Sequence, residues 1–266
     1  MKISELKAGL KTNIIAKKII YFNEVTSTND VAFALANNGL ANNGAVDGTL
    51  VIADSQTMGK GRLGRKWFSP KGKSILASLI LRPQIPLSHS GNINLITTIS
   101  IVDAIRHLTN LNAMIKWPND IVINYKKVSG VLVESKIEGN CADFFVVGFG
   151  VNVNIPKEDF PEEIFDIATS LNIELGYEVS TTQLLQDILY QIELRYTRMT
   201  KDLADFYLEW KNLSITIGQR VRIEKSDNVF FAKALDIDKN GALIIQLDSG
   251  EIQSIMNDDL VKVRNI

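Results

Sequence analysis

A glycine-rich, cationic run occupies residues 59–67, with the sequence GKGRLGRKW. Glycine lets a backbone approach a ligand closely and adopt positive φ. Arginine grips phosphates and carboxylates with a planar fork, and lysine does so as a point charge. No acidic residue lies between Ser55 and Val102, although the formal net charge of the whole chain is only −1. This run therefore predicts a loop that wraps an anionic ligand.

Other interpretations of the run compete with this one. Its glycines satisfy the G-x-G-x-x-G spacing of dinucleotide-binding turns and follow a strand predicted at 48–53. The acidic residue that such sites place about 20 positions further on is missing near Gln84. A phosphate-binding P-loop ending at Ser74 would need a glycine where Trp67 stands. A solvated basic hairpin loop remains open as an alternative.

A second group of chemically capable residues is the run KWPND at 116–120. Pro118 biases the residue before it toward an extended conformation. Asn119 and Asp120 can hydrogen-bond their own backbone in turns. We therefore expect Lys116 and Asp120 to flank a tight corner at a strand end, where ligand-positioning groups commonly lie.

The elements that must position these residues indicate an α+β fold, with a mixed β-sheet backed by helices. Short turns between strands, such as the one expected at 124–127, favour this layer over a doubly wound sheet. A cap region at 27–29 precedes the first helix. Helices are predicted at 30–37, 92–109 and 181–210, and strands at 48–53, 121–123, 130–134 and 144–147.

Beyond Leu213 the pattern changes to short strands separated by hairpin-turn signals at 239–241 and 248–250. The strands are predicted at 221–223, 230–237, 242–247, 251–255 and 260–263. Such spacing over about 50 residues indicates a small β-barrel. We therefore expect two domains, residues 1–213 and 214–266.

Taken together, these motifs resemble those of the biotin protein ligases, in the form that lacks an N-terminal DNA-binding domain. The similarity runs from about Tyr21 to the C-terminus. It is carried by residues 27–30, 56–67, 116–120, 127–134, 148–152 and 168–171. The resemblance implies a catalytic domain like that of class II aminoacyl-tRNA synthetases, followed by an SH3-like C-terminal barrel.

The resemblance also implies a two-step reaction with ATP and biotin as substrates and Mg²⁺ as cofactor. The biotin carboxylate attacks the α-phosphate of ATP, giving biotinyl-5′-AMP and diphosphate. A lysine of a biotin carboxyl carrier protein or domain then takes the biotinyl group and releases AMP. Because an anion meets a polyanion, positioning and charge neutralisation are the main demands. A closing loop would also protect the mixed anhydride from water.

Roles for single residues follow from the same resemblance. Three residues are expected to be catalytic: Arg62 at the α-phosphate and biotin carboxylate, Lys116 at the phosphates, and Lys127 at the biotinyl carbonyl oxygen. Asp120 is the candidate to hold Mg²⁺ or to orient the incoming amine. The expected biotin-binding residues are Ser27, Thr28, Asn29, Gln56, Lys60, Gly61, Arg62 and Lys127. The expected ATP-binding residues are Arg62, Arg65, Trp67, Lys116, Asn119, Asp120 and Asn152.

Some of these residues have ordinary structural alternatives. Trp67 and Trp117 could equally pack in the core, and Asn152 could cap its own turn. Lys60 and Leu63 stand where some relatives carry arginines. Lysine keeps the charge but loses the planar fork, and leucine removes the charge. Neither departure touches the core of the motif.

Three other functions compete with the biotin ligase. A lipoate or octanoate ligase shares the fold and the acyl-adenylate chemistry, but resembles a different loop that this chain does not contain. A nucleic-acid-binding protein would need stacking aromatics among the basic residues, where only Trp67 and Phe68 are present. A non-catalytic biotin binder would have no use for Arg62, Lys116 and Lys127.

Composition adds expectations about compartment and partners. With 45% hydrophobic and 22% charged residues, the chain reads as a globular protein, with no membrane-spanning run of roughly 18 apolar residues and no secretory signal. The single cysteine, Cys141, fits a reducing cytoplasm and has no histidine to support a nucleophilic role. His89 and His107 are too separated for a metal site. DNA binding is not expected, and the protein would be a monomer or homodimer.

Overall fold

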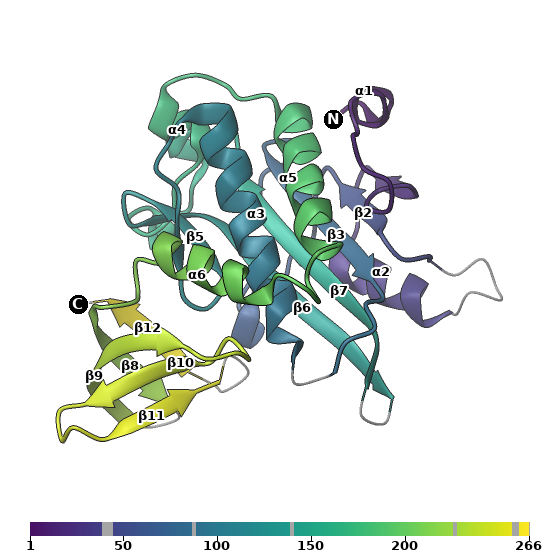
Figure 1. Cartoon of the computed structure of the whole chain (residues 1–266). Coiled ribbons are helices and arrows are strands. Elements are labelled where there is room, and N and C mark those ends of the chain that lie inside the picture. The colour runs from purple at the N-terminus through teal and green to yellow at the C-terminus, as the bar shows by residue number, and fades with distance from the viewer. Residues whose placement is uncertain (39–44, 87–88, 139–140, 226–227, 257–260, 266) are drawn as a thin grey trace.

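The structure, a computed structural model, describes residues 1–38, 45–86, 89–138, 141–225, 228–256 and 261–265 (Figure 1). Its α-helices are α1 Ile3–Ala8, α2 Thr28–Asn37, α3 Gly91–Thr109, α4 Leu171–Leu175, α5 Thr181–Tyr196 and α6 Leu203–Leu213. The strands of the larger sheet are β1 Ile19–Phe22, β2 Thr49–Ala53, β3 Ser74–Leu81, β4 Met114–Lys116, β5 Asp120–Ile123, β6 Lys126–Glu138 and β7 Cys141–Asn152. The strands of the smaller sheet are β8 Arg220–Lys225, β9 Asn228–Ile237, β10 Leu243–Leu247, β11 Ile252–Ile255 and β12 Val261–Asn265.

The larger sheet has the strand order β1-β2-β3-β7-β6-β5-β4, in which only β1 and β2 run parallel. Its central strands are apolar on both faces because helices cover both. On β7, Phe145 and Val147 join the main core, while Phe144 and Val146 pack in a second cluster with alanines of α2. Strands buried on both faces read as continuous apolar runs, since successive side chains alternate between the faces. The predicted mixed sheet backed by helices is confirmed.

A two-residue turn joins β5 to β6 at the start of the long β5–β6–β7 meander. Asn124 and Tyr125 both adopt positive φ, 49° and 63°, in the predicted turn between β5 and β6. This is the conformation that two-residue hairpin turns require. The sequence KKVSG that follows then runs directly into β6, which brings Lys127 back beside Asp120. The turn residues Gly139 and Asn140, beside Cys141, lie outside the described residues.

The single long helix predicted over 181–210 is wrong: the chain forms α5 and α6, separated by residues 197–202. The Thr197 hydroxyl donates to the Glu193 carbonyl oxygen (2.9 Å), and Arg198 pairs with Asp202 (2.5 Å). Threonine bonds of this kind to backbone carbonyls weaken a helix end. After the break, α6 reaches the smaller sheet, where the Lys211 ammonium pairs with Asp236 (2.8 Å).

The C-terminal strands form an antiparallel sheet in the order β11-β10-β9-β8-β12, as the alternation of short strands and turns predicts. Both expected hairpin turns are present, at 239–241 and 248–250, between β9 and β10 and between β10 and β11. Closure of this sheet into a barrel stays a prediction. No helix in the described part of the chain is long and apolar enough to cross a membrane.

Glu193 ties the start of the chain to α5. Its carboxylate, 8% exposed, accepts hydrogen bonds from the backbone N–H groups of Asn13 (2.6 Å), Ile14 (2.8 Å) and Ile15 (2.8 Å). Glu193→Gln places an NH₂ group against these donors, so we expect a loss of about 2 kcal/mol in the free energy of unfolding. Urea denaturation measures it, with Glu178→Gln at an exposed position as control. Equal midpoints for the two variants would contradict this role.

Candidate active site

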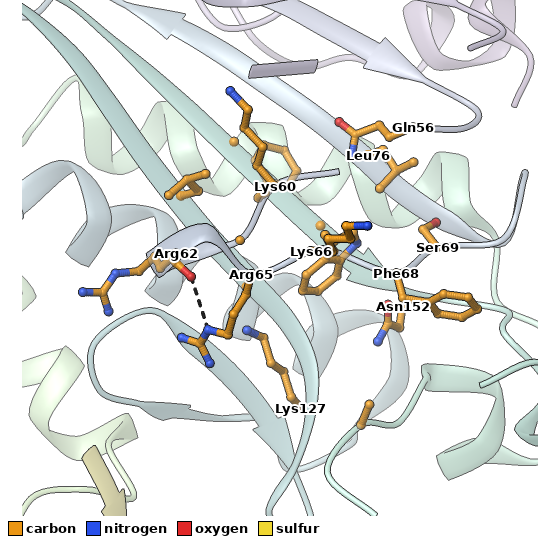
Figure 2. A pocket seen from close by; sticks show the side chains of 18 of the residues that line it. Gln56, Lys60, Arg62, Arg65, Lys66, Phe68, Ser69, Leu76, Lys127 and Asn152 are labelled. Atoms are coloured by element: carbon orange, nitrogen blue, oxygen red, sulfur yellow. Dashed lines mark hydrogen bonds between the residues drawn. The ribbon is translucent and has the colours of Figure 1, made fainter. Parts of the chain in front are cut away.

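A cavity of about 770 Å³ lies over the middle of the larger sheet, between the start of α2 and the loop that holds the basic run. Leu76 and Ala77 of β3, and glycines of β6 and β7, form part of its floor. Figure 2 shows Lys60, Arg62, Arg65, Lys66 and Lys127 around it. Five cationic side chains and only two carboxylates, Asp120 and Glu163, line this cavity. The site is therefore built for an anionic ligand.

Trp67 lies flat on the sheet because two strands present glycine beneath it. Gly130 and Gly150 stand opposite each other in the β6–β7 register. A Cβ at residue 150 would lie 2.5 Å from Cε2 of the indole, and one at residue 130 would lie 3.3 Å from its Cζ3. The buried Trp67 Nε1 has no hydrogen-bond partner among the described residues. A buried N–H without a partner is costly, and this one lies against Gly150 of β7.

The basic run folds into a tight hairpin whose backbone closes on itself. The Trp67 N–H donates to the Gly59 carbonyl oxygen (2.9 Å), and the Gly61 N–H donates to that of Arg65 (2.7 Å). The Arg65 Nε–H donates to the Arg62 carbonyl oxygen at 3.2 Å, the dashed line in Figure 2. Leu63 sits at the tip with φ 58°. The hairpin therefore keeps the guanidinium groups of Arg62 and Arg65 at the cavity.

Lys60 fastens this hairpin to α2 through an ion pair with Asp30. The hydrogen bond that the Lys60 ammonium donates to Asp30 raises the pKa of Lys60; burial opposes the shift, and the charges of Asp30 and Glu134 add to it. Because folding raises this pKa, the stabilisation is complete below the pKa of the unfolded chain and is lost as pH rises through the folded value. The Lys60 ammonium therefore stays charged through neutral pH and loses its proton only in alkaline solution.

An NMR titration of the Lys60 side chain tests this ion pair. We expect Lys60 in the wild type to titrate above the usual lysine value of about 10.4, and its midpoint to fall in Asp30→Asn because the stabilising partner is lost. The same midpoint in both proteins would contradict the ion pair. We also expect the hairpin of Asp30→Asn to be cleaved faster by protease in the absence of ligands.

The start of α2 contributes polar groups that are held from below by β3. The Ser78 hydroxyl on β3 lies 2.6 Å from Asn29 Oδ1 and 2.8 Å from the Thr28 hydroxyl. Gln56 Oε1 accepts from the Thr28 N–H (2.6 Å), which leaves the Gln56 NH₂ as a donor for a ligand. Ser27 precedes the helix, is 2% exposed, and makes no side-chain cap bond. The Ser-Thr-Asn stretch thus forms one polar wall of the cavity.

Lys127 and Asp120 form the opposite end of the site. The Lys127 ammonium lies 2.5 Å from the Asp120 carboxylate and 5.4 Å from the centre of the Trp67 ring. Both groups come from the β5–β6 hairpin, so the pair is set by strand register. An ammonium has three donor hydrogens, so Lys127 can keep Asp120 and still donate to a ligand oxygen.

A segment that the sequence analysis missed closes the remaining side. The Lys127 N–H donates to the Ile167 carbonyl oxygen (2.8 Å), and the Thr169 N–H donates to the Lys127 carbonyl oxygen (2.9 Å). The Asn152 NH₂ donates to the Thr169 carbonyl oxygen (3.0 Å), so Asn152 does not simply cap its own turn. This segment lines the cavity with Phe160, Pro161, Glu163, Ile164, Ile167 and Ala168. Its sequence, FPEEIFDIA at 160–168, is rich in acidic residues and contains no glycine, so nothing in it predicts a place beside an anionic ligand.

Most residues expected at the site do line the cavity. These are Ser27, Thr28, Asn29, Gln56, Lys60, Gly61, Arg62, Arg65, Trp67, Asn119, Asp120, Lys127 and Asn152. Lys116 does not: it stands opposite Asp120 in the β4–β5 pair and is not a lining residue. Trp117, left open between wall and core, is 3% exposed and part of the core, with a cis peptide bond to Pro118. Asn119 uses its NH₂ on the Val131 carbonyl oxygen, a structural bond.

The carboxylates present fit a metal ion that arrives with a nucleotide. No group of three His, Cys, Asp or Glu side chains that could hold a metal occurs in the described ranges. Asp120 and Glu163 are the two carboxylates of the cavity. Mg²⁺ is usually bound through one or two carboxylates together with substrate phosphates. The residues therefore suit Mg²⁺ carried by ATP, with Asp120 as the group that would contact it.

Comparison with known proteins shows which protein family this chain resembles. Residues 21–152 match the Biotin/lipoate A/B protein ligase family, and residues 216–256 match the Biotin protein ligase C terminal domain. The chain is 38% identical to the Bifunctional ligase/repressor BirA of Bacillus subtilis (strain 168), over 97% of this chain and 78% of the relative. It is 30% identical to the Biotin--[acetyl-CoA-carboxylase] ligase of Mycobacterium tuberculosis, over 82% and 80% respectively.

The fold agrees with a solved structure of biotin protein ligase from Aquifex aeolicus in complex with biotin and ATP. The TM-score is 0.79 at 28% identity, covering 94% of this chain and 100% of that chain. Fold and cationic cavity together define a ligase of the biotin/lipoate class. More narrowly, the chain belongs to the biotin protein ligase family.

Proposed function

We propose that this protein activates biotin with ATP to biotinyl-5′-AMP and transfers the biotinyl group to a lysine of a biotin carboxyl carrier domain. The observation that carries the proposal is the cavity itself. One wall is neutral and polar, and the other is a cationic hairpin. Biotinyl-5′-AMP matches these two walls. Its uncharged polar ring would face the neutral wall, and its carboxyl–phosphate linkage would face the cationic hairpin.

The neutral wall suits the ureido ring of biotin. Burying a polar amide-like ring without partners costs a few kcal/mol, about 2 or more, so the wall must offer hydrogen bonds. Ser27 and the Gln56 NH₂ are available there, while Thr28 and Asn29 are held in place by Ser78. The carboxylate of biotin would then extend along Gly61 toward Arg62 and Lys127.

The cationic groups act by neutralising charge where two anions meet. Arg62 would bind the biotin carboxylate and the α-phosphate, and Arg65 would bind phosphates of ATP. Lys127 would offset the charge of the biotin carboxylate in the first step and donate to the carbonyl oxygen of the biotinyl group in the second, where negative charge grows as the amine attacks. Pre-aimed donors in a site that excludes water are worth far more than donors in bulk water. The role proposed for Lys116 at the phosphates would require it to act from outside the lining of the cavity.

The remaining residues of the site would hold the adenylate and shield it. Trp67 and Asn152 border the space expected for the nucleotide, together with Asn119 and Asp120. The buried Asn152 Oδ1 has no partner in the described part of the chain, so it is an acceptor available to a nucleotide amine or hydroxyl. The apolar side chains of Phe160, Ile164 and Ile167 would limit the access of water to the mixed anhydride.

The proposal also divides the chain into a catalytic domain, 1–213, and a C-terminal domain, 214–266. The protein would act in the cytoplasm, on a carrier domain of a carboxylase. A lipoate ligase is the nearest alternative, because the first domain belongs to a class that includes both activities. The match of residues 216–256 to the Biotin protein ligase C terminal domain favours biotin.

Intact-mass analysis of an apo biotin-carrier domain tests the function. The carrier is incubated with the protein, ATP and Mg²⁺, with biotin or lipoate offered in separate tubes. A biotinyl-sized gain in the biotin tube alone is the expected result. A lipoyl-sized gain would favour the alternative. No gain and no release of AMP or diphosphate would overturn the proposal.

A further inference from the structure

The C-terminal domain makes a compact contact with the first domain through the turn between β9 and β10, residues 238–241. Asp238 stabilises this turn, because its Oδ1 accepts from the N–H groups of Asn240 (2.8 Å) and Ala242 (3.0 Å). Figure 1 shows the smaller sheet beside α6 and one end of α3. The turn therefore presents a rigid row of backbone carbonyl groups to the first domain.

Three successive carbonyl groups of this turn meet three different elements. The Tyr207 hydroxyl of α6 lies within hydrogen-bonding distance of the Lys239 carbonyl oxygen and 2.6 Å from Asn92 Oδ1 on α3. The Asn240 carbonyl oxygen lies so close to Gly91 that a Cβ at that residue would collide with it. The Trp117 indole N–H donates to the Gly241 carbonyl oxygen at 3.1 Å.

Trp117 is thus held from both ends by the C-terminal part of the chain. Its backbone N–H donates to the Thr216 hydroxyl (3.0 Å), in the segment that enters the smaller sheet, and its side chain is 3% exposed. Burial, followed by the charge of Asp238, raises the pKa of the Tyr207 hydroxyl, which keeps it protonated as a donor to the same turn. These contacts place residue 117 without any contribution from the cavity.

Pro118 and Asn119, whose backbone carbonyl groups are both hydrogen-bonded, connect Trp117 to Asp120 and Lys127. The Pro118 carbonyl oxygen accepts from the Asn94 NH₂ of α3 (2.8 Å), and the Asn119 carbonyl oxygen accepts from the Val131 N–H of β6 (3.0 Å). The next residue is Asp120, whose carboxylate holds the Lys127 ammonium at 2.5 Å. A shift of Trp117 would therefore move Asp120 and Lys127. It would not move the residues of the neutral wall, because these lie on other elements.

We propose that Trp117 is a positioning residue: anchored to the β9–β10 turn of the C-terminal domain, it sets the placement of Asp120 and Lys127 for biotinyl-adenylate formation. This inference rests on the proposed function. It assigns the C-terminal domain a part in the first half-reaction that does not require the domain to touch either substrate.

Steady-state kinetics of adenylate formation test the inference with paired variants. Trp117→Phe removes the indole N–H and keeps an aromatic ring, and Tyr207→Phe removes the second donor to the same turn. A misplacement of 1 Å can cost about 10²-fold in rate, so a smaller shift is expected to lower kcat about tenfold. The KM for biotin should stay within about twofold. The double variant should lose less than the product of the two single losses, because both act through one turn.

Tyr196→Phe is the matched control, since its hydroxyl lies 3.0 Å from Asp47 and not on the turn. An unchanged kcat in Trp117→Phe and Tyr207→Phe, or losses no larger than in the control, would overturn the inference and leave the proposed function standing. Wild-type protein that forms no adenylate would overturn both. If Trp117→Phe does not fold, Tyr207→Phe decides alone: a lower kcat with unchanged KM supports the inference, and any other result overturns it.

Discussion

Replacing Lys127 by methionine should lower the rate of biotinyl-adenylate formation by at least about 10²-fold, because the change removes a cation that offsets the repulsion between the biotin carboxylate and the phosphates of ATP. Methionine replaces the apolar stem of the lysine, which folds over Gly130 toward the cavity, and lacks only the terminal ammonium group. A loss should also appear in the second step, since the biotinyl carbonyl becomes tetrahedral there and its oxygen gains negative charge. Diphosphate release measures the first step and transfer from preformed adenylate measures the second.

Lys126→Met is the control for Lys127→Met. Lys126 is the preceding residue of β6, so its side chain points to the other face of the strand and does not line the cavity. It removes one cation from the same strand and should leave both steps nearly unchanged. Thermal unfolding of both variants checks the fold, because Lys127→Met also leaves Asp120, which is partly exposed, without its ion pair. Equal turnover in the two variants would show that Lys127 does not act at the carbonyl oxygen.

Arg62→Gly should release the adenylate from the site, so that biotin appears on lysines of bystander proteins. The guanidinium is proposed to bind both the carboxylate and the phosphate of this intermediate, and a bidentate arginine contact to an anion is among the strong hydrogen bonds. The Arg62 carbonyl oxygen, which accepts from Arg65, is retained in glycine, so the hairpin can still close. Mass spectrometry of albumin added to the reaction measures the stray labelling.

Lys71→Gly is the matched control for Arg62→Gly. It removes a cation from the same basic stretch at an exposed position that does not line the cavity. We expect no bystander labelling by this variant and wild-type rates of carrier biotinylation. A dissociation rate of the adenylate from Arg62→Gly equal to that of the wild type would contradict the proposed hold on the intermediate.

Several features of the site follow from local sequence, and the structure bears them out. The apolar run that becomes β7 contains no charged residue between Phe144 and Val151, so it can be buried on both faces. The central strand β3, Ser74–Leu81, is not among the strands predicted from the sequence. Asn124 and Tyr125 reverse the chain as a two-residue turn should. The glycines and cations at 59–67 do form a tight hairpin that lines a cavity.

Other features depend on residues that are distant along the chain. The segment 160–168 lines the cavity because its end pairs with the backbone of Lys127, about 40 residues earlier, and no local pattern records that pairing. An indole suits both a cavity wall and the core, so the local sequence does not place Trp117. Its hydrogen bond to the Gly241 carbonyl oxygen, in the β9–β10 turn, holds it in the core. The break between α5 and α6 was also missed, because the apolar spacing continues through it.

By itself, the sequence determined where several apolar strands lie, where the chain turns, and that the glycines and cations at 59–67 form one loop. These properties are local, because they depend on side-chain type, on the backbone freedom of glycine and on the alternation of faces along a strand. Tertiary structure alone decided that Lys127 pairs with Asp120, that Trp67 lies over Gly150, and that Lys116 stays outside the cavity lining. Such contacts are chosen by strand register and by packing between segments far apart in the chain, and no short stretch of sequence contains that information.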